Sequence, residues 1–97
     1  MAATGSHTFD ADSIVTGDVR VREIEAADGS RVFDVSAEAS VTILSGGVPA
    51  CGFHVEGHAQ CDRVEDCDEA TAKARDAARE NCRRGARAYC DVHNGEA

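Results

Sequence analysis

The hydrophobic pattern of residues 51–90 changes its period once, and this change constrains the fold more than any other feature of the sequence. Residues 51–61 alternate between apolar and polar side chains, a period of two that is typical of a strand with one buried face. From residue 67 onward, small apolar side chains recur at the spacing of one helix face. We therefore expect a strand, a short acidic turn and one long helix.

The predicted strand 51–61 has one apolar face and one polar face. The apolar face consists of Cys51, Phe53, Val55, Ala59 and Cys61. The polar face consists of His54, Glu56, His58 and Gln60. Gly57 falls on the apolar face, where a missing side chain indicates a bulge or a close approach of another backbone segment.

The predicted helix begins with a capping signal and buries only small side chains. Asp66 is suited to the N-cap, and Glu69 three residues later closes a capping box. Gly85 either ends the helix early as a C-cap or lies within a helix that runs to about Tyr89. The expected buried face is Cys67, Ala70, Thr71, Ala74, Ala78, Cys82, Ala86 and Tyr89. Such a face packs close to a sheet but contributes modestly to stability, because it buries little apolar area.

The first half of the chain predicts a hairpin that completes the sheet. A strand over 14–24 is expected to point Val15, Val19 and Val21 inward, and Ile14, Thr16, Asp18, Arg20 and Arg22 outward. The second strand, over 32–43, has the cleanest alternation in the chain. A three-residue loop at 27–29 places Val35 opposite Val21, whereas a two-residue loop mixes the two faces. We therefore expect the three-residue loop.

Residues 45–50 predict a turn before the third strand. The expected fold is α+β: a three-stranded antiparallel meander with one C-terminal helix packed on one face, a βββα arrangement. We expect a flexible N-terminal tail over 1–12, a single domain over 13–92 and a C-terminal tail over 93–97.

Composition limits both stability and partners. Large apolar residues are few in this chain of 97 residues and Trp is absent, so we expect disulfides or a second chain to support the fold. The net charge of −8 argues against nucleic acid and anionic membranes as partners. No apolar run reaches the roughly 20 residues of a membrane span. A homo-oligomer or another protein is the expected partner.

Five cysteines are the candidates for disulfide bonds: Cys51, Cys61, Cys67, Cys82 and Cys90. We prefer Cys61 with Cys67, and one further bond among the other three. Cys82 and Cys90 lie about 12 Å apart on an unbroken helix, too far for a bond unless the chain turns back at Gly85. The alternative is that all five are reduced and act as small apolar fillers. This cysteine usage favours a secreted or periplasmic protein after signal removal over a cytoplasmic one.

Two imidazoles and one carboxylate on the polar face of strand 51–61 form a candidate metal site: His54, Glu56 and His58. Neighbours two residues apart in a strand lie about 6.7 Å apart and can share a metal. His54 and His58 lie about 13 Å apart and can share one only if a bulge at Gly57 draws them together. The alternative is a solvated sheet face, because no recognised zinc spacing is present.

Four arginines at intervals of four residues form a ladder on the predicted helix: Arg75, Arg79, Arg83 and Arg87. Like charges at this spacing repel one another weakly, and Asp76 and Glu80 lie close enough to offset part of the repulsion. We interpret the ladder as a candidate docking stripe for an acidic partner, a phosphate or a carboxylate. The alternative is an exposed helix face of mixed charge.

The sequence favours a non-catalytic role and indicates no particular cofactor, because no nucleophile elbow, phosphate-binding glycine loop or dinucleotide fingerprint is present. The first hypothesis is an acidic binding or assembly module that self-associates and is stabilised by disulfides. The second is a small protein that uses a metal at the histidine face or an unpaired thiol. The third is an accessory small-molecule-binding protein or enzyme whose pocket forms between subunits.

Overall fold

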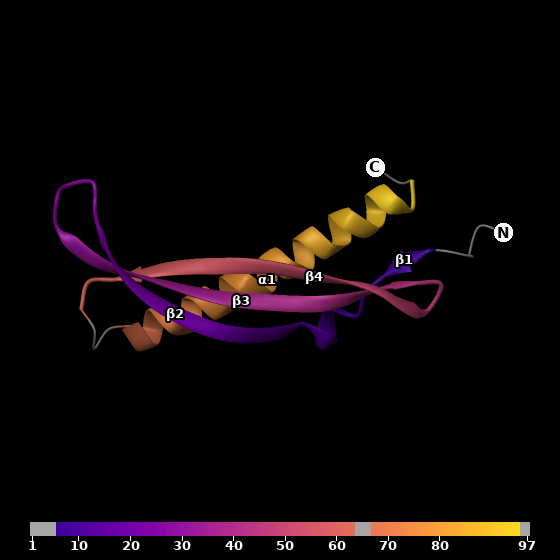
Figure 1. Cartoon of the computed structure of the whole chain (residues 1–97), viewed down its shortest axis with the longest axis horizontal. Coiled ribbons are helices and arrows are strands. Elements are labelled where there is room, and N and C mark those ends of the chain that lie inside the picture. The colour runs from indigo at the N-terminus through magenta and orange to yellow at the C-terminus, as the bar shows by residue number, and fades with distance from the viewer. Residues whose placement is uncertain (1–5, 64–66, 96–97) are drawn as a thin grey trace.

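The chain folds into an antiparallel sheet with one C-terminal helix packed on it, and this confirms the predicted α+β class (Figure 1). The computed structural model describes residues 6–63 and 67–95. The elements are β1 (His7–Thr8), the short 3₁₀ helix η1 (Ala11–Ser13), β2 (Val15–Glu25), β3 (Arg31–Ser45), β4 (Val48–Cys61) and α1 (Cys67–His93). β3 is central, with β4 along one side and β2 followed by the short β1 along the other.

The loop between β2 and β3 has the predicted three residues. The amide of Ala26 donates a 2.7 Å hydrogen bond to the carbonyl of Ser30, which closes the loop 27–29. Val21 consequently lies directly opposite Val35. The carboxylate of Asp28 accepts hydrogen bonds from the hydroxyl and the amide of Ser30, and these hydrogen bonds lower the pKa of Asp28.

A bulge in β2 overturns part of the predicted inward set. Between the pairs Thr16–Ala39 and Val19–Ala37, β2 has two residues where β3 has one. Because one extra residue inverts the alternation, Ile14 and Thr16 turn toward the helix side and Val15 turns away from it. Ile14, expected outside, is 8% exposed, whereas Val15, expected inside, is 58% exposed.

The turn between β3 and β4 is shorter than the predicted segment 45–50. Ser45 pairs with Val48, so only Gly46 and Gly47 lie between the strands. Their φ angles of 61° and 84° are the two positive values that a type I′ turn requires, and glycine adopts them without strain. Both strands therefore extend to this turn.

Helix α1 buries most of the predicted face and extends past both predicted C-terminal ends. Its buried residues are Cys67, Ala70, Ala74, Ala78, Cys82, Ala86 and Cys90. Thr71 and Tyr89, which were also expected on this face, are only half-buried, and Cys90 is buried although it was not predicted there. The predicted N-cap, Asp66, lies outside the described residues. Gly85 does not end the helix, which continues to His93. A Cβ on Gly85 would lie 2.5 Å from Cζ of Phe53, so this glycine makes room for the phenyl ring.

Gly57 marks a close approach between the helix and the sheet. A Cβ at this position would lie 2.2 Å from the amide nitrogen of Ala78 and 2.6 Å from the carbonyl oxygen of Ala74. The register between β3 and β4 passes through Gly57 without a shift. Of the two alternatives that the sequence left open at Gly57, the structure therefore has backbone contact and no bulge.

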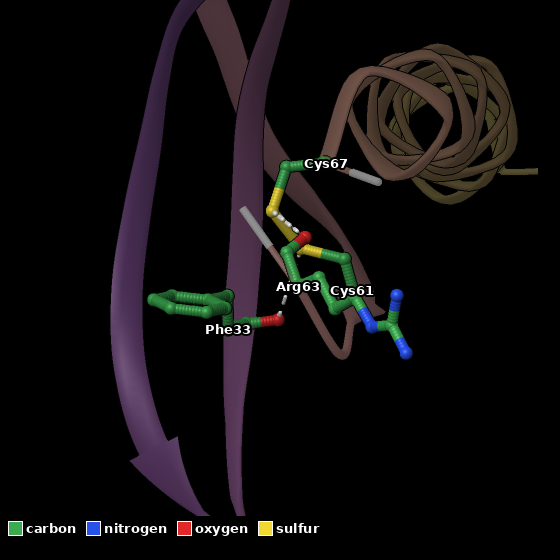
Figure 2. The surroundings of a disulfide bond; sticks show 4 residues. All are labelled: Phe33, Cys61, Arg63 and Cys67. Atoms are coloured by element: carbon green, nitrogen blue, oxygen red, sulfur yellow. Dashed lines mark hydrogen bonds between the residues drawn. A yellow bond between two sulfur atoms is a disulfide. The ribbon is translucent and has the colours of Figure 1, made fainter. Parts of the chain in front are cut away.

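A disulfide-length contact ties the start of α1 to the end of β4 (Figure 2). Sγ of Cys61 lies 2.05 Å from Sγ of Cys67, which is the preferred pair of the sequence analysis. The carbonyl oxygens of Phe33 and Arg63 lie 3.8 Å and 3.4 Å from the two sulfur atoms. The cysteine pair therefore anchors the helix beside β4 at this end of the sheet.

The molecule is thin and long. Its extents are 58 × 23 × 15 Å, and its radius of gyration is 16.8 Å. A compact chain of this length has a radius of gyration of about 12.5 Å. The largest fully buried side chains are Ile43, Val35 and Cys82, so the core between the two layers is shallow. Within the described ranges, no helical segment has both the length and the apolar character needed to cross a bilayer.

Both predicted tails contain ordered structure. β1 and η1 lie inside the segment 1–12 or directly beside it, and β1 pairs with the end of β3. Asn94, in the segment 93–97, accepts a 2.7 Å hydrogen bond from the amide of His7 and donates a 2.9 Å hydrogen bond to its carbonyl. β1 and the residue that follows α1 are therefore held together.

Candidate functional site

The outer face of the sheet, opposite the helix, carries a polar groove that crosses all three long strands. Its volume is about 590 Å³. It is lined by Arg20, Val21, Arg22, Asp34, Ser36, Glu56 and His58. Arg20 lies directly opposite Ser36, and Ser36 directly opposite His58, so one row across the sheet contains three potential hydrogen-bond donors. We call this cavity the outer groove and these three residues the donor row.

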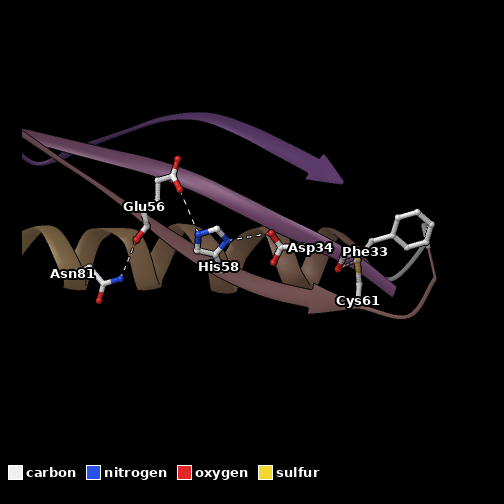
Figure 3. A network of polar contacts seen from close by, with 6 residues as sticks. All are labelled: Phe33, Asp34, Glu56, His58, Cys61 and Asn81. Atoms are coloured by element: carbon white, nitrogen blue, oxygen red, sulfur yellow. Dashed lines mark hydrogen bonds and ion pairs between the residues drawn. The ribbon is translucent and has the colours of Figure 1, made fainter. Parts of the chain in front are cut away.

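His58 is held between two carboxylates in the outer groove (Figure 3). Its Nδ1 lies 3.2 Å from Oδ2 of Asp34, and its Nε2 lies 3.4 Å from Oε1 of Glu56. Only the imidazolium form has a proton on both nitrogens and can donate to both carboxylates. The side chain of Asp34 is 16% exposed, whereas those of His58 and Glu56 are about half exposed. The deeper contact therefore fixes the orientation of the ring.

The predicted metal site is not assembled in the structure. Glu56 and His58 are in contact, but His54 lies near the bulge of β2, in a separate depression beside Gly17 and Asp18. The bulge at Gly57 that would bring the two histidines together is absent. Across residues 6–63 and 67–95, no three His, Cys, Asp or Glu side chains are grouped so that they could hold a metal ion.

The second disulfide, predicted among Cys51, Cys82 and Cys90, does not form. All three are free, and the unbroken α1 keeps Cys82 and Cys90 too far apart to bond to each other. Burial raises the pKa of the Cys82 thiol, and burial followed by the charges of Asp91 and Cys51 raises that of Cys90. Both buried thiols are therefore disfavoured as nucleophiles. Cys51 is exposed, and its Sγ lies 3.6 Å from the hydroxyl of Tyr89.

The predicted arginine ladder lies on exposed helix surface, but its members have different surroundings. Arg83 and Arg84 both donate to the carboxylate of Glu80, and these hydrogen bonds lower the pKa of Glu80. Arg75 and Arg79 make no side-chain hydrogen bond or ion pair with any residue in 6–63 or 67–95. Arg83 and Arg87 line a cavity of about 370 Å³ beside β1. The ladder is therefore a mixed-charge face that borders a cavity at one end.

Sequence reasoning missed a cluster of rings where the ends of the chain meet. The rings of Tyr89 and His93 stack with centroids 3.9 Å apart, and the ring of His7 lies 5.1 Å from that of His93. Nδ1 of His93 donates to the carbonyl of Tyr89, 2.9 Å away, while Nδ1 of His7 is buried and has no hydrogen-bond partner among the described residues. The only available signal was the interval of four residues between Tyr89 and His93, which places both on one side of a helix that continues past Gly85.

Sequence reasoning did not identify Arg20, Ser36 and His58 as one row. The predicted three-residue loop already implies that Arg20 lies opposite Ser36. The pairing of Ser36 with His58 depends instead on the two-residue turn between β3 and β4 and on the register shift between Ile43 and Leu44. Comparisons with protein-family models, with curated proteins and with solved structures find no match to this chain.

Proposed function

We propose that the chain is a small non-catalytic assembly module that associates with a second copy of itself along β2. The observation that carries the proposal is a contrast within one cross-strand pair. Val21 and Val35 lie opposite each other and point to the same side of the sheet. Val35 is 0% exposed under α1, whereas Val21 is 53% exposed. The helix therefore leaves the inner face of β2 uncovered around Val21, although Val19 of the same strand packs against the core.

The exposed surface of the chain supports a partner of this kind. A folded monomer of 10.2 kDa exposes about 5,300 Å², whereas this chain exposes 6332 Å². The excess of about 1,000 Å² is comparable to the roughly 800 Å² that each partner buries in a specific interface. Burial of the uncovered side of β2 by a second copy would bring the exposed surface close to that of a compact protein.

The effect of salt on binding distinguishes a second copy of the chain from a basic protein as the partner. Two chains that each carry −8 repel one another, and added salt screens that repulsion. β2 contributes little to the repulsion, because its two arginines nearly balance its three acids. Self-association is therefore expected to strengthen with salt, whereas binding to a basic partner would weaken.

The test is the mass of the protein in solution by light scattering, over a wide range of concentration and at low and moderate salt. The wild-type chain is expected to form a dimer that dissociates on dilution. Val21→Glu places a charge on the uncovered side of β2 and is expected to give a monomer, with a circular dichroism spectrum like that of the wild type.

Val48→Glu is the matched control, because Val48 is also an exposed valine, at 63%, but lies next to the turn between β3 and β4. This variant is expected to remain dimeric. A wild-type chain that stays monomeric at every concentration would refute the proposal. Equal loss of the dimer in both variants would show that β2 is not the interface.

A further inference from the structure

We propose that the outer groove binds a phosphate monoester, with Arg20, Arg22, Ser36 and the imidazolium form of His58 as hydrogen-bond donors. The groove lies on the face of the sheet opposite the helix, and its volume of about 590 Å³ is within the usual range for small-molecule sites. This inference does not depend on self-association.

The donor row has the geometry of an anion site. Arg20, Ser36 and His58 lie directly opposite one another on three neighbouring strands, which are about 4.8 Å apart. An anion seated over Ser36 is therefore within reach of a guanidinium from one side and an imidazole from the other. Arg22, two residues along β2, extends from the same side of the sheet as Arg20.

The donors on this side of the groove are not used within the described structure. Arg20, Arg22 and Ser36 make no side-chain hydrogen bond or ion pair with any described residue. Arg22 lies directly opposite Asp34, but the carboxylate of Asp34 contacts His58 instead. Two guanidinium groups and one hydroxyl are consequently available to a ligand.

His58 can exchange one of its two carboxylate contacts for a ligand oxygen. The contact of Nε2 with Glu56, at 3.4 Å, is longer than a good hydrogen bond, and both side chains are about half exposed. The contact of Nδ1 with the less exposed Asp34 holds the ring in place. A phosphate oxygen that replaces Glu56 at Nε2 leaves that orientation unchanged.

The number and kind of donors favour phosphate over carboxylate. A guanidinium group donates two parallel hydrogen bonds to adjacent oxygens, and a phosphate monoester offers three terminal oxygens to two such groups and a hydroxyl. The carboxylates of Asp34 and Glu56 oppose an anion in the same groove. We therefore expect weak binding that decreases with salt.

The test is an amide NMR titration with methyl phosphate at constant ionic strength, at a protein concentration at which light scattering reports a monomer. Saturable shifts are expected at Arg20, Ser36 and His58. The double variant Arg20→Gln/Arg22→Gln is expected to weaken binding about tenfold or more, or about 1.4 kcal/mol. The matched control is Arg75→Gln/Arg79→Gln, which removes the same charge from the helix and is expected to bind as the wild type does.

Three results would overturn the proposal. The first is the absence of saturable shifts in the groove. The second is acetate binding as tightly as methyl phosphate, which would contradict the expected preference for a ligand with three terminal oxygens. The third is an equal loss of affinity in the helix control, which would show that binding reflects net charge or the arginine ladder rather than the outer groove. Each can be recognised whether or not the chain dimerises.

Discussion

The two sides of β3 are covered very differently. On the β4 side, the helix backbone touches Gly57, the ring of Phe53 fills the space beside Gly85, and Cys61 lies at disulfide distance from Cys67. On the β2 side, Val21 is more than half exposed although its cross-strand neighbour Val35 is completely buried. One helix is too narrow to cover three strands, and small residues draw this helix toward β4.

The comparison extends to the free edges of the sheet. On the β4 side, Nδ2 of Asn81 donates a 3.0 Å hydrogen bond to the carbonyl of Glu56, so a helix side chain occupies part of that edge (Figure 3). No described side chain makes such a hydrogen bond to the backbone of β2, which instead carries a bulge and five charged residues among its 11. The hydrogen bond from Asn81 occupies part of the β4 edge, whereas the β2 edge is distorted by the bulge and carries charged side chains. Both features hinder pairing with a strand of another chain.

The largest expected effect lies at the backbone contact on the β4 side. Gly57→Ala would place a methyl group 2.2 Å from the amide of Ala78, and relief requires the helix to move. We expect the free energy of unfolding, measured by chemical denaturation, to fall by about 3 kcal/mol.

Gly52→Ala is the matched control, because its Cβ would meet only the ring of His54, at 3.3 Å, and that side chain can turn away. A change within about 0.5 kcal/mol is expected for Gly52→Ala. Similar losses in both variants would mean that the helix does not rest on Gly57.

The next largest effect comes from Val35, and it tests the contrast directly. Val35→Ala removes two methyl groups from a fully buried site and is expected to cost about 2.5 kcal/mol of unfolding free energy. Val21→Ala removes the same two groups from the uncovered side of the same pair and is expected to cost less than about 0.5 kcal/mol. Both are measured by chemical denaturation on the monomer. Equal losses of unfolding free energy would contradict the conclusion that the helix covers Val35 but not Val21.

A somewhat smaller effect is expected from the tether between β4 and the helix. Cys61 and Cys67 close a short loop, and the chain-entropy model assigns such a disulfide about 2 kcal/mol. The double variant Cys61→Ala/Cys67→Ala is expected to lose that amount in thermal and chemical unfolding. Reductant is expected to destabilise the wild type by the same amount and to leave the double variant unchanged. A wild type that is insensitive to reductant would show that the bond is not formed.

The sequence was sufficient wherever one periodicity determined the structure. Alternation located β3 and β4, the three-residue loop set the pairing of Val21 with Val35, and the helical spacing identified the small residues under α1. The close approach at Gly57 was one of two alternatives that alternation left open. In each case a pattern within a short stretch of sequence was sufficient, because the structure there depends on contacts with the adjacent strand or helix.

The remaining features depend on contacts that no local pattern encodes. The bulge at residues 17–18 inverts the start of β2, yet Ile14 and Val15 are equally apolar, so either could have been the buried residue. Gly85 was a candidate C-cap because the sequence does not show that the ring of Phe53, 32 residues earlier, packs against it and requires a glycine there. The donor row needs the register of three strands at once.

The backbone contact at Gly57 also has a mechanical consequence. Where side chains separate two layers, the layers can slide past each other as the side chains change rotamer. Here the helix backbone contacts the strand backbone directly, and Asn81 donates a hydrogen bond to the neighbouring carbonyl of Glu56. We expect α1 to tilt about this point of backbone contact rather than to slide along the sheet. The Cys61–Cys67 pair limits this movement at one end, and the contacts of His93 and Asn94 with His7 of β1 limit it at the other.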